Sequence, residues 1–135
     1  MVSKGDSLFL FSKNRGDFRT DIYGLPKMPG EYVTSIQGSF DSEGLVTGAD
    51  YRKRDSKGEL VLVGYSIHGK AFYPFILHFS NIEGSRFFEG EYERMDFRKV
   101  LQTESIIFHG EDKAYLTNEE EDGAKGFLYE ADLEH

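Results

Sequence analysis

The sequence predicts an all-β fold of short antiparallel strands, because its composition, its strand-like runs and its turns agree. The 135 residues include 12 Phe, 8 Tyr and 15 Gly but only 3 Pro, a mixture typical of β-rich domains. About ten short runs are apolar or alternate between apolar and polar residues, which is the pattern of strands. No run keeps the ~3.6-residue period of an amphipathic helix.

The predicted strands follow one another along the whole chain. Residues 8–12 (LFLFS) form an apolar run, residues 21–25 (DIYGL) end at Pro26, and residues 32–36 alternate in polarity. Each of these patterns is typical of a short strand. Further strands are predicted at residues 45–51, 59–66, 75–80, 92–97, 105–109, 113–117 and 126–131.

Turn residues stand where the predicted hairpins reverse. The segment Lys13–Asp17 is polar and contains Gly, and Pro29-Gly30 is a strong turn dipeptide. The segment Asp55–Gly58 suits a tight hairpin with Gly58 in a left-handed conformation. Hairpin-connected strands predict an antiparallel fold, which leaves a barrel, a sandwich and part of a propeller open.

An internal repeat favours the propeller among these architectures. Residues 59–66 align with residues 8–15, which lie 51 positions earlier, and with residues 113–120, which lie 54 positions later. A period of about 52 residues holding four strands is typical of a β-propeller blade. The four strands of a blade are labelled A to D from the central channel outward. The first three predicted strands occupy positions B to D of one blade, the next four occupy positions A to D of a second, and the last three occupy positions A to C of a third. Residues 1–132 form one segment of about two and a half antiparallel four-stranded blades.

The alternative is a barrel or sandwich of about ten strands, in which the repeat has no structural meaning. A barrel of this kind would be a closed monomer with one cavity for a small ligand. The propeller interpretation instead leaves two apolar blade faces uncovered, since fewer than about four blades do not close a ring. It therefore predicts self-association, with a dimer that imitates a six-bladed ring.

Several segments of the sequence resemble segments of bacterial six-bladed propellers. LFLFSKNRGDFRTDIYGLP (8–26) is similar to a hairpin of such proteins. GLVTGADY (44–51), followed by LVLVGYS (60–66), is similar to the entry strands of blades in uncharacterised secreted bacterial propellers. TESIIF (103–108), AYLTNEE (114–120) and FLYEADL (127–133) resemble a blade of phytase-like and esterase-like propellers, although Ser105 stands where those families carry Gly. The resemblance implies a bacterial protein that is secreted or lies in the cell envelope.

Charge and composition exclude several classes of partner and chemistry. With 16 basic and 24 acidic residues the formal charge is −8, which disfavours nucleic acid and anionic membrane surfaces as partners. The chain has no Cys, which excludes disulfides, thiolate zinc sites and cysteine nucleophiles. No apolar run approaches the ~18 residues of a membrane span, so we expect no membrane insertion. The final residues 133–135 look like the start of a vector-encoded tag.

Acidic residues supply the candidate ligand sites. Glu43 and Glu104 occupy equivalent blade positions, and the resemblance implies that such positions face an axial channel, together with Asp50 and His109. Glu119 and Glu120 begin a dense acidic run, Glu119–Asp122, that is either a solvated loop or part of a Ca²⁺ site. No other cofactor is expected.

Other motifs point to surfaces rather than to catalysis. Phe87-Phe88 lies in a loop between Gly84 and Gly90 and is expected to form an exposed apolar interaction patch. Arg15-Gly16-Asp17 matches an adhesion tripeptide, but a turn explains the same residues. No Gly-x-Ser-x-Gly elbow and no phosphate-binding glycine loop is present.

The sequence therefore predicts a non-catalytic binding or scaffold segment of a larger propeller protein. Its partners would be the remaining blades, a second copy of the chain, or a protein or small-molecule ligand. The alternative, implied by the resemblance, is part of a calcium-dependent phytase-like or esterase-like hydrolase.

Overall fold

The computed structural model describes residues 1–120 and 125–133 of the chain. The first four strands form sheet A, the next four form sheet B and the last three form sheet C. Sheet A contains β1 (Val2–Lys4), β2 (Ser7–Phe11), β3 (Arg19–Pro26) and β4 (Ile36–Asp41). Sheet B contains β5 (Leu45–Arg54), β6 (Lys57–His68), β7 (Ala71–Ile82) and β8 (Glu91–Asp96). Sheet C contains β9 (Thr103–His109), β10 (Lys113–Asn118) and β11 (Leu128–Asp132).

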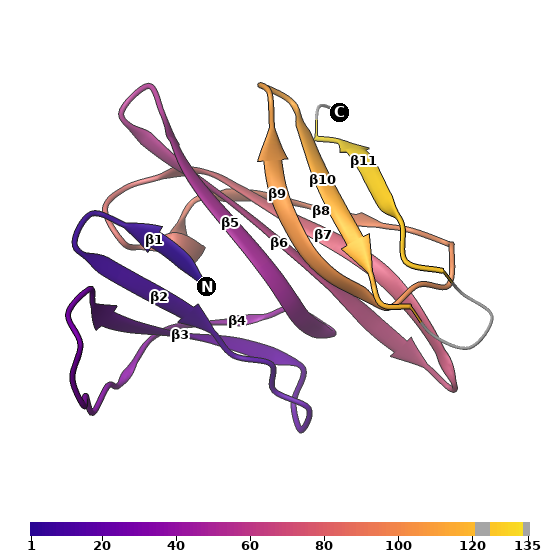
Figure 1. Ribbon diagram of the computed structural model, residues 1–135, viewed down its shortest axis with the longest axis horizontal. Coiled ribbons are helices and arrows are strands. Elements are labelled where there is room, and N and C mark those ends of the chain that lie inside the picture. Colours follow the sequence, from indigo (N-terminus) through magenta and orange to yellow (C-terminus); the bar gives the residue numbers. More distant parts are fainter. Residues whose placement is uncertain (121–124, 134–135) are drawn as a thin grey trace.

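Each sheet is an antiparallel meander whose strands pair in chain order. Figure 1 shows the three sheets following one another, from indigo β1 to yellow β11. The expectation of an all-β antiparallel fold is confirmed, because the described residues contain no α-helix and a single 3-10 turn, η1 (Phe87–Glu89). In the described part of the chain, no helix has the length and apolar character needed to cross a membrane.

Sheet B is the middle layer, and its central strands β6 and β7 are buried on both faces. Side chains alternate across a strand, so Leu60 and Leu62 of β6 pack toward sheet A, with Phe9 and Ile22. The intervening Val61 and its neighbours on the same face pack toward sheet C. This second cluster comprises Val61, Val63, Ile76, Ile106, Ala114, Leu116, Ala131 and Leu133. An unbroken apolar run such as LVLV is therefore what a doubly covered strand requires.

The first strands of sheets B and C approach each other closely. A Cβ atom on Gly48 of β5 would lie 2.8 Å from the Cα atom of Ser105 on β9. A β-bulge adjoins Gly48, and there the Thr47 hydroxyl donates a hydrogen bond of 2.8 Å to the Thr103 carbonyl. Strand β1 contacts β5 in turn, so the three first strands are neighbours in space.

The structure corrects the predicted strands of sheet A. The strand predicted at residues 32–36 is wrong, because residues 31–35 carry no strand and Val33 is fully exposed, with a relative accessibility of 105%. The pairing strand β4 starts at Ile36 and carries Phe40, which packs against the core. Its Gly and Ser residues hid it from the sequence pattern, and the short β1 was not predicted at all.

The turn between β5 and β6 also differs from expectation. The two strands pair down to Arg54 and Lys57, so the loop consists of Asp55 and Ser56 alone. Both residues have positive φ, 48° and 66°, as a two-residue hairpin turn requires. Gly58 is already inside β6, where a Cβ atom would lie 2.7 Å from the Tyr51 hydroxyl.

Leu133, the first of the three residues assigned to a tag, packs in the folded core. It is 4% exposed, packs with the cluster between sheets B and C, and its backbone N–H donates to the Asp112 carbonyl. The other residues assigned to a tag, 134–135, lie outside the described residues.

Candidate functional site

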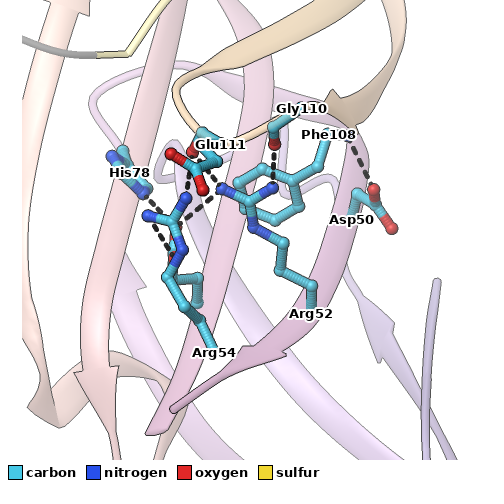
Figure 2. A network of polar contacts seen from close by, with 8 residues as sticks. Asp50, Arg52, Arg54, His78, Phe108, Gly110 and Glu111 are labelled. Atoms are coloured by element: carbon cyan, nitrogen blue, oxygen red, sulfur yellow. Dashed lines mark hydrogen bonds and ion pairs between the residues drawn. The ribbon is translucent and has the colours of Figure 1, made fainter.

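A group of partly buried basic side chains surrounds the buried Glu59 on β6. Figure 2 shows Arg52, Arg54 and His78 of this group converging. Glu59 is buried, and its carboxylate lies 3.4 Å from Arg52 Nη2 and 3.3 Å from Arg54 Nη1. On the other side, His78 Nε2 of β7 donates a hydrogen bond of 3.0 Å to Glu59 Oε2. A buried carboxylate needs such partners, because desolvation of an unpaired charge is strongly unfavourable.

The same two arginines reach across to sheet C. Arg52 donates from Nη1 to the Gly110 carbonyl and from Nη2 to the Glu111 carbonyl, the latter at 2.5 Å. Arg54 donates to the Glu111 carbonyl at 2.6 Å. The Arg52 guanidinium also stacks over the Phe108 ring, with 4.2 Å between its Cζ and the ring centroid. The arginines thus join a carboxylate of sheet B to the β9–β10 turn of sheet C.

This arrangement is suited to holding two sheets together. Every cation in it is directed at the Glu59 carboxylate or at a backbone carbonyl, which leaves the arginines engaged within the fold. We call the side chains of Arg52, Arg54, Glu59 and His78, with the carbonyls of Gly110 and Glu111, the arginine clamp.

Asp50 and His109, two predicted channel residues, have other surroundings. The Asp50 carboxylate accepts a hydrogen bond of 2.8 Å from the Phe108 backbone N–H, so it pins β5 to β9 (Figure 2). His109 is exposed and stacks on Tyr115, with ring centroids 4.2 Å apart. Both residues therefore make structural contacts at sheet C.

The structure does not gather the predicted acidic ligands into one site. Glu43 is exposed at the β4–β5 turn, whereas Glu104 and Glu119 line a separate hollow of about 260 Å³ near the start of β9. Glu120 is exposed, and the rest of the acidic run, residues 121–122, lies outside the described residues. Among residues 1–120 and 125–133, no group of three or more His, Asp or Glu side chains could hold a metal ion.

The predicted exposed patch at Phe87-Phe88 is wrong. Phe87 is 1% exposed, and its ring centroid lies 4.9 Å from that of Phe9 and 5.6 Å from that of Tyr51. Phe88 packs against Phe79 and Phe40. The loop folds inward as η1 because its two aromatic rings fill the space between sheets A and B.

Another hollow, with a volume of about 480 Å³, has a lining of charged, polar and aromatic side chains. Glu43, His68 and Arg98 are among the residues that line it. Arg94 also lines it, but this side chain donates to Asp96 at 3.0 Å and to the Ser42 carbonyl at 2.5 Å, and stacks on Phe75. Arg94 therefore joins β8 to the β4–β5 turn.

Sequence reasoning missed the arginine clamp, although a signal for it existed. Arg52 and Arg54 are two residues apart on one strand, and the two-residue turn pairs Arg52 with Glu59. Opposite charges at these positions indicate a cross-strand ion pair. His78 of β7 and the carbonyls of Gly110 and Glu111 become partners only when the strands and sheets have packed together. The sequence of one hairpin therefore does not predict them.

Comparisons with protein-family models, with curated proteins and with solved structures found no match for the chain.

Proposed function

We propose that the chain is a non-catalytic binding or scaffold segment of propeller type, part of a larger bacterial protein that is secreted or lies in the envelope. The observation that carries the proposal is the burial of sheet B on both faces between two further meanders. Successive four-stranded meanders stacked face to face are the building plan of a propeller. The polar network best suited to chemistry, the arginine clamp, is engaged in holding these layers together.

The outer face of sheet A supports a role in association. Its side chains alternate with those in the core, and cross-strand pairing places Leu8 beside Leu25 and Leu10 beside Tyr23. Tyr23 is in turn paired with Ile36 on β4. Leu10 and Ile36 are 37% and 56% exposed, and a continuous apolar row of this kind is typical of an interaction surface.

The outer face of sheet C carries both apolar and polar side chains. Ile107, which is 57% exposed, is paired with Tyr115. Polar contacts surround them, because Lys113 Nζ lies 2.9 Å from Glu130 Oε1 and Ser105 is hydrogen-bonded to Thr117. We propose that a second copy places its sheet A against this face, so that two copies complete a ring with two equivalent contacts.

Light scattering after size exclusion tests this proposal. The chain is expected to have twice its 15.4 kDa mass, and Leu10→Lys and Ile107→Lys are each expected to give the monomer, because a ring needs both faces. Ser85→Lys, at an exposed position in the β7–β8 connection, is the matched control and is expected to leave the dimer intact.

Two results would count against the ring. A wild-type chain that stays monomeric at high concentration would remove self-association altogether. A dimer that is lost with Leu10→Lys but kept with Ile107→Lys would mean that two A faces meet each other instead.

A further inference from the structure

The inner face of sheet B continues past the apolar core toward the β6–β7 turn. Leu60 and Leu62 of β6 are fully buried toward sheet A. Further along the same face of β6, Ser66 is half-buried and His68 is exposed. Tyr73 of β7 is paired in register with Ser66, so its side chain is on this face too. The end of sheet B therefore offers a polar and aromatic surface that sheet A does not cover.

Arg94 closes the core at this end and holds the turn beside it. Its guanidinium stacks on the Phe75 ring, with 4.2 Å between Cζ and the ring centroid. It also donates to the Ser42 carbonyl at 2.5 Å and to the Asp96 carboxylate at 3.0 Å. Because Glu43 directly follows Ser42, this contact fixes the β4–β5 turn and places Glu43 beside the uncovered end of sheet B.

Glu43 is held in an unusual backbone conformation. Its φ is 50°, in the left-handed region that favours glycine, and its N–H donates to the Asp41 carboxylate at 3.1 Å. The Glu43 carboxylate itself makes no hydrogen bond or ion pair to another described residue. A side chain that is kept in such a conformation, and that contributes no polar contact to the fold, points to a function outside folding.

These elements enclose the hollow of about 480 Å³ described above, a volume within the range of about 300–1,000 Å³ for small-molecule sites. Arg98, in the β8–β9 connection, also lines it, and its guanidinium has no hydrogen bond or ion pair within the described part of the chain. The hollow therefore combines an engaged pair, Arg94 and Asp96, with two free groups, Glu43 and Arg98.

The charges around the hollow indicate a neutral ligand. Its two guanidinium groups offset its two carboxylates, so neither an anion nor a cation gains a net attraction. The formal charge of −8 further disfavours an anion. A zwitterion would have to form ion pairs with Glu43 and Arg98, which are both exposed, and exposed ion pairs contribute little to binding.

The free groups of the hollow indicate a ligand rich in hydroxyl groups. The Arg98 guanidinium can only donate hydrogen bonds and the Glu43 carboxylate can only accept them, whereas a hydroxyl group does both. The rings of His68 and Tyr73 lie edge to face, with centroids 5.5 Å apart, and supply an aromatic wall for an apolar ligand surface. A sugar ring carries neighbouring hydroxyl groups and an apolar face of C–H groups.

We propose that this hollow binds a neutral saccharide. Hydroxyl groups of the sugar are hydrogen-bonded to Glu43 and Arg98, and an apolar face of the sugar packs against His68 and Tyr73. This inference goes beyond the ring described above, because the hollow lies on neither of the two outer faces that the ring would bury.

Two-dimensional amide NMR of the whole chain tests the proposal with four neutral disaccharides: maltose, cellobiose, lactose and diacetylchitobiose. At least one is expected to shift the amides of Ser66, His68 and Tyr73, with a dissociation constant of about 1 mM, because each hydrogen bond to the sugar replaces one to water. Glucosamine, which is cationic, and glucuronate, which is anionic, are expected to bind no more tightly than glucose.

Three variants separate binding from folding. Glu43→Gly removes the carboxylate and suits the positive φ, so it is expected to weaken binding about tenfold while the melting temperature stays close to that of the unmodified chain. Arg98→Gln is also expected to weaken binding about tenfold. Arg15→Gln, at an exposed position in the β2–β3 connection, is the matched control for the lost charge and is expected to bind like the unmodified chain.

Three results would overturn the inference. The first is the absence of shifts with all four disaccharides at about 100 mM, which would saturate a site of about 1 mM affinity, and this result would leave the ring untouched. The second is unchanged binding in both Glu43→Gly and Arg98→Gln, which would place the sugar elsewhere. The third is tighter binding of glucosamine or glucuronate than of glucose, which would assign the hollow to a charged ligand.

Discussion

Arg52 and Glu59 are cross-strand partners on the β5–β6 hairpin, and Arg52 Nη2 lies 3.4 Å from Glu59 Oε2. The same guanidinium donates to carbonyls of the β9–β10 turn. The Arg52 side chain therefore links the two strands of the hairpin to each other and also links the hairpin to sheet C. This double engagement makes the arginine clamp the polar counterpart of the apolar layer between sheets B and C.

Glu59→Gln is expected to destabilise the protein by about 2 kcal/mol. The loss of the carboxylate leaves two arginines without their buried counterion, and partial exposure of both arginines keeps the effect below the value for a fully buried pair. Urea unfolding measures the change. Glu111→Gln is the control, because only the backbone carbonyl of Glu111 enters the clamp. Equal stability of the two variants would contradict the role of Glu59.

Phe87→Ala is expected to lower the free energy of unfolding by about 3–5 kcal/mol, the range for a large aromatic side chain removed from a core. Its ring contacts Phe9, Phe11 and Tyr51 between sheets A and B. Phe127→Ala, at a position that is 53% exposed, is expected to change stability by about 0.5 kcal/mol or less. Thermal or urea unfolding of the two variants decides between a core and a surface role.

Gly48→Ala is expected to destabilise the protein, since a Cβ atom there would lie 2.8 Å from the Ser105 Cα and 3.1 Å from the Glu104 carbonyl oxygen. Both neighbours are backbone atoms, so β5 and β9 must separate to make room. Gly16→Ala has no atom within 4 Å of the added carbon and serves as the control. A melting temperature unchanged by Gly48→Ala would show that the two strands are further apart than described.

Asp21 is expected to titrate below its ordinary value of 3.8. The Asn14 amide donates to its carboxylate at 2.9 Å, and this hydrogen bond, with a further one from Ser39, lowers the pKa of Asp21. A lowered folded-state pKa contributes stability that is present above the ordinary value and is lost as pH falls through the folded-state value. Carboxyl NMR titration should show the pKa of Asp21 rising toward 3.8 in Asn14→Ala.

The comparison for this titration is Arg19→Ala, which removes the positive charge that also lowers the pKa of Asp21 and keeps the Asn14 hydrogen bond. It is expected to raise the pKa of Asp21 less than Asn14→Ala does, because the charge of Arg19 is the smaller cause. A larger rise in Arg19→Ala than in Asn14→Ala would assign the shift to charge rather than to the Asn14 hydrogen bond.

The sequence predicts the strands that are apolar or regularly alternating, because those patterns follow directly from burial. The strand at 59–66, for example, is found within β6, Lys57–His68. The sequence pattern does not predict β4, because Gly38 and Ser39 resemble a turn and only Phe40 reaches the core. Local propensity is a weak guide to a strand whose main contribution is pairing with β3.

The candidate site is predicted less well, because it depends on contacts between sheets. Equivalent positions in a repeat do not place Glu43 and Glu104 together, since one lies at a turn and the other on β9. The loop position of Phe87 and Phe88 predicts exposure, but their aromatic side chains favour burial, and the structure buries Phe87 between sheets A and B. The arginine clamp needs the β9–β10 turn, which lies more than fifty positions along the chain from Arg52.

Coverage of sheet B on both faces also has a consequence for how the protein opens. Amide protons on β6 and β7 cannot exchange with solvent until a neighbouring sheet has moved away. Sheets A and C each have one open face, so either can fray without the other. The slowest-exchanging amides are therefore expected in the middle of the chain, and fluctuations at its two ends are expected to be independent of each other.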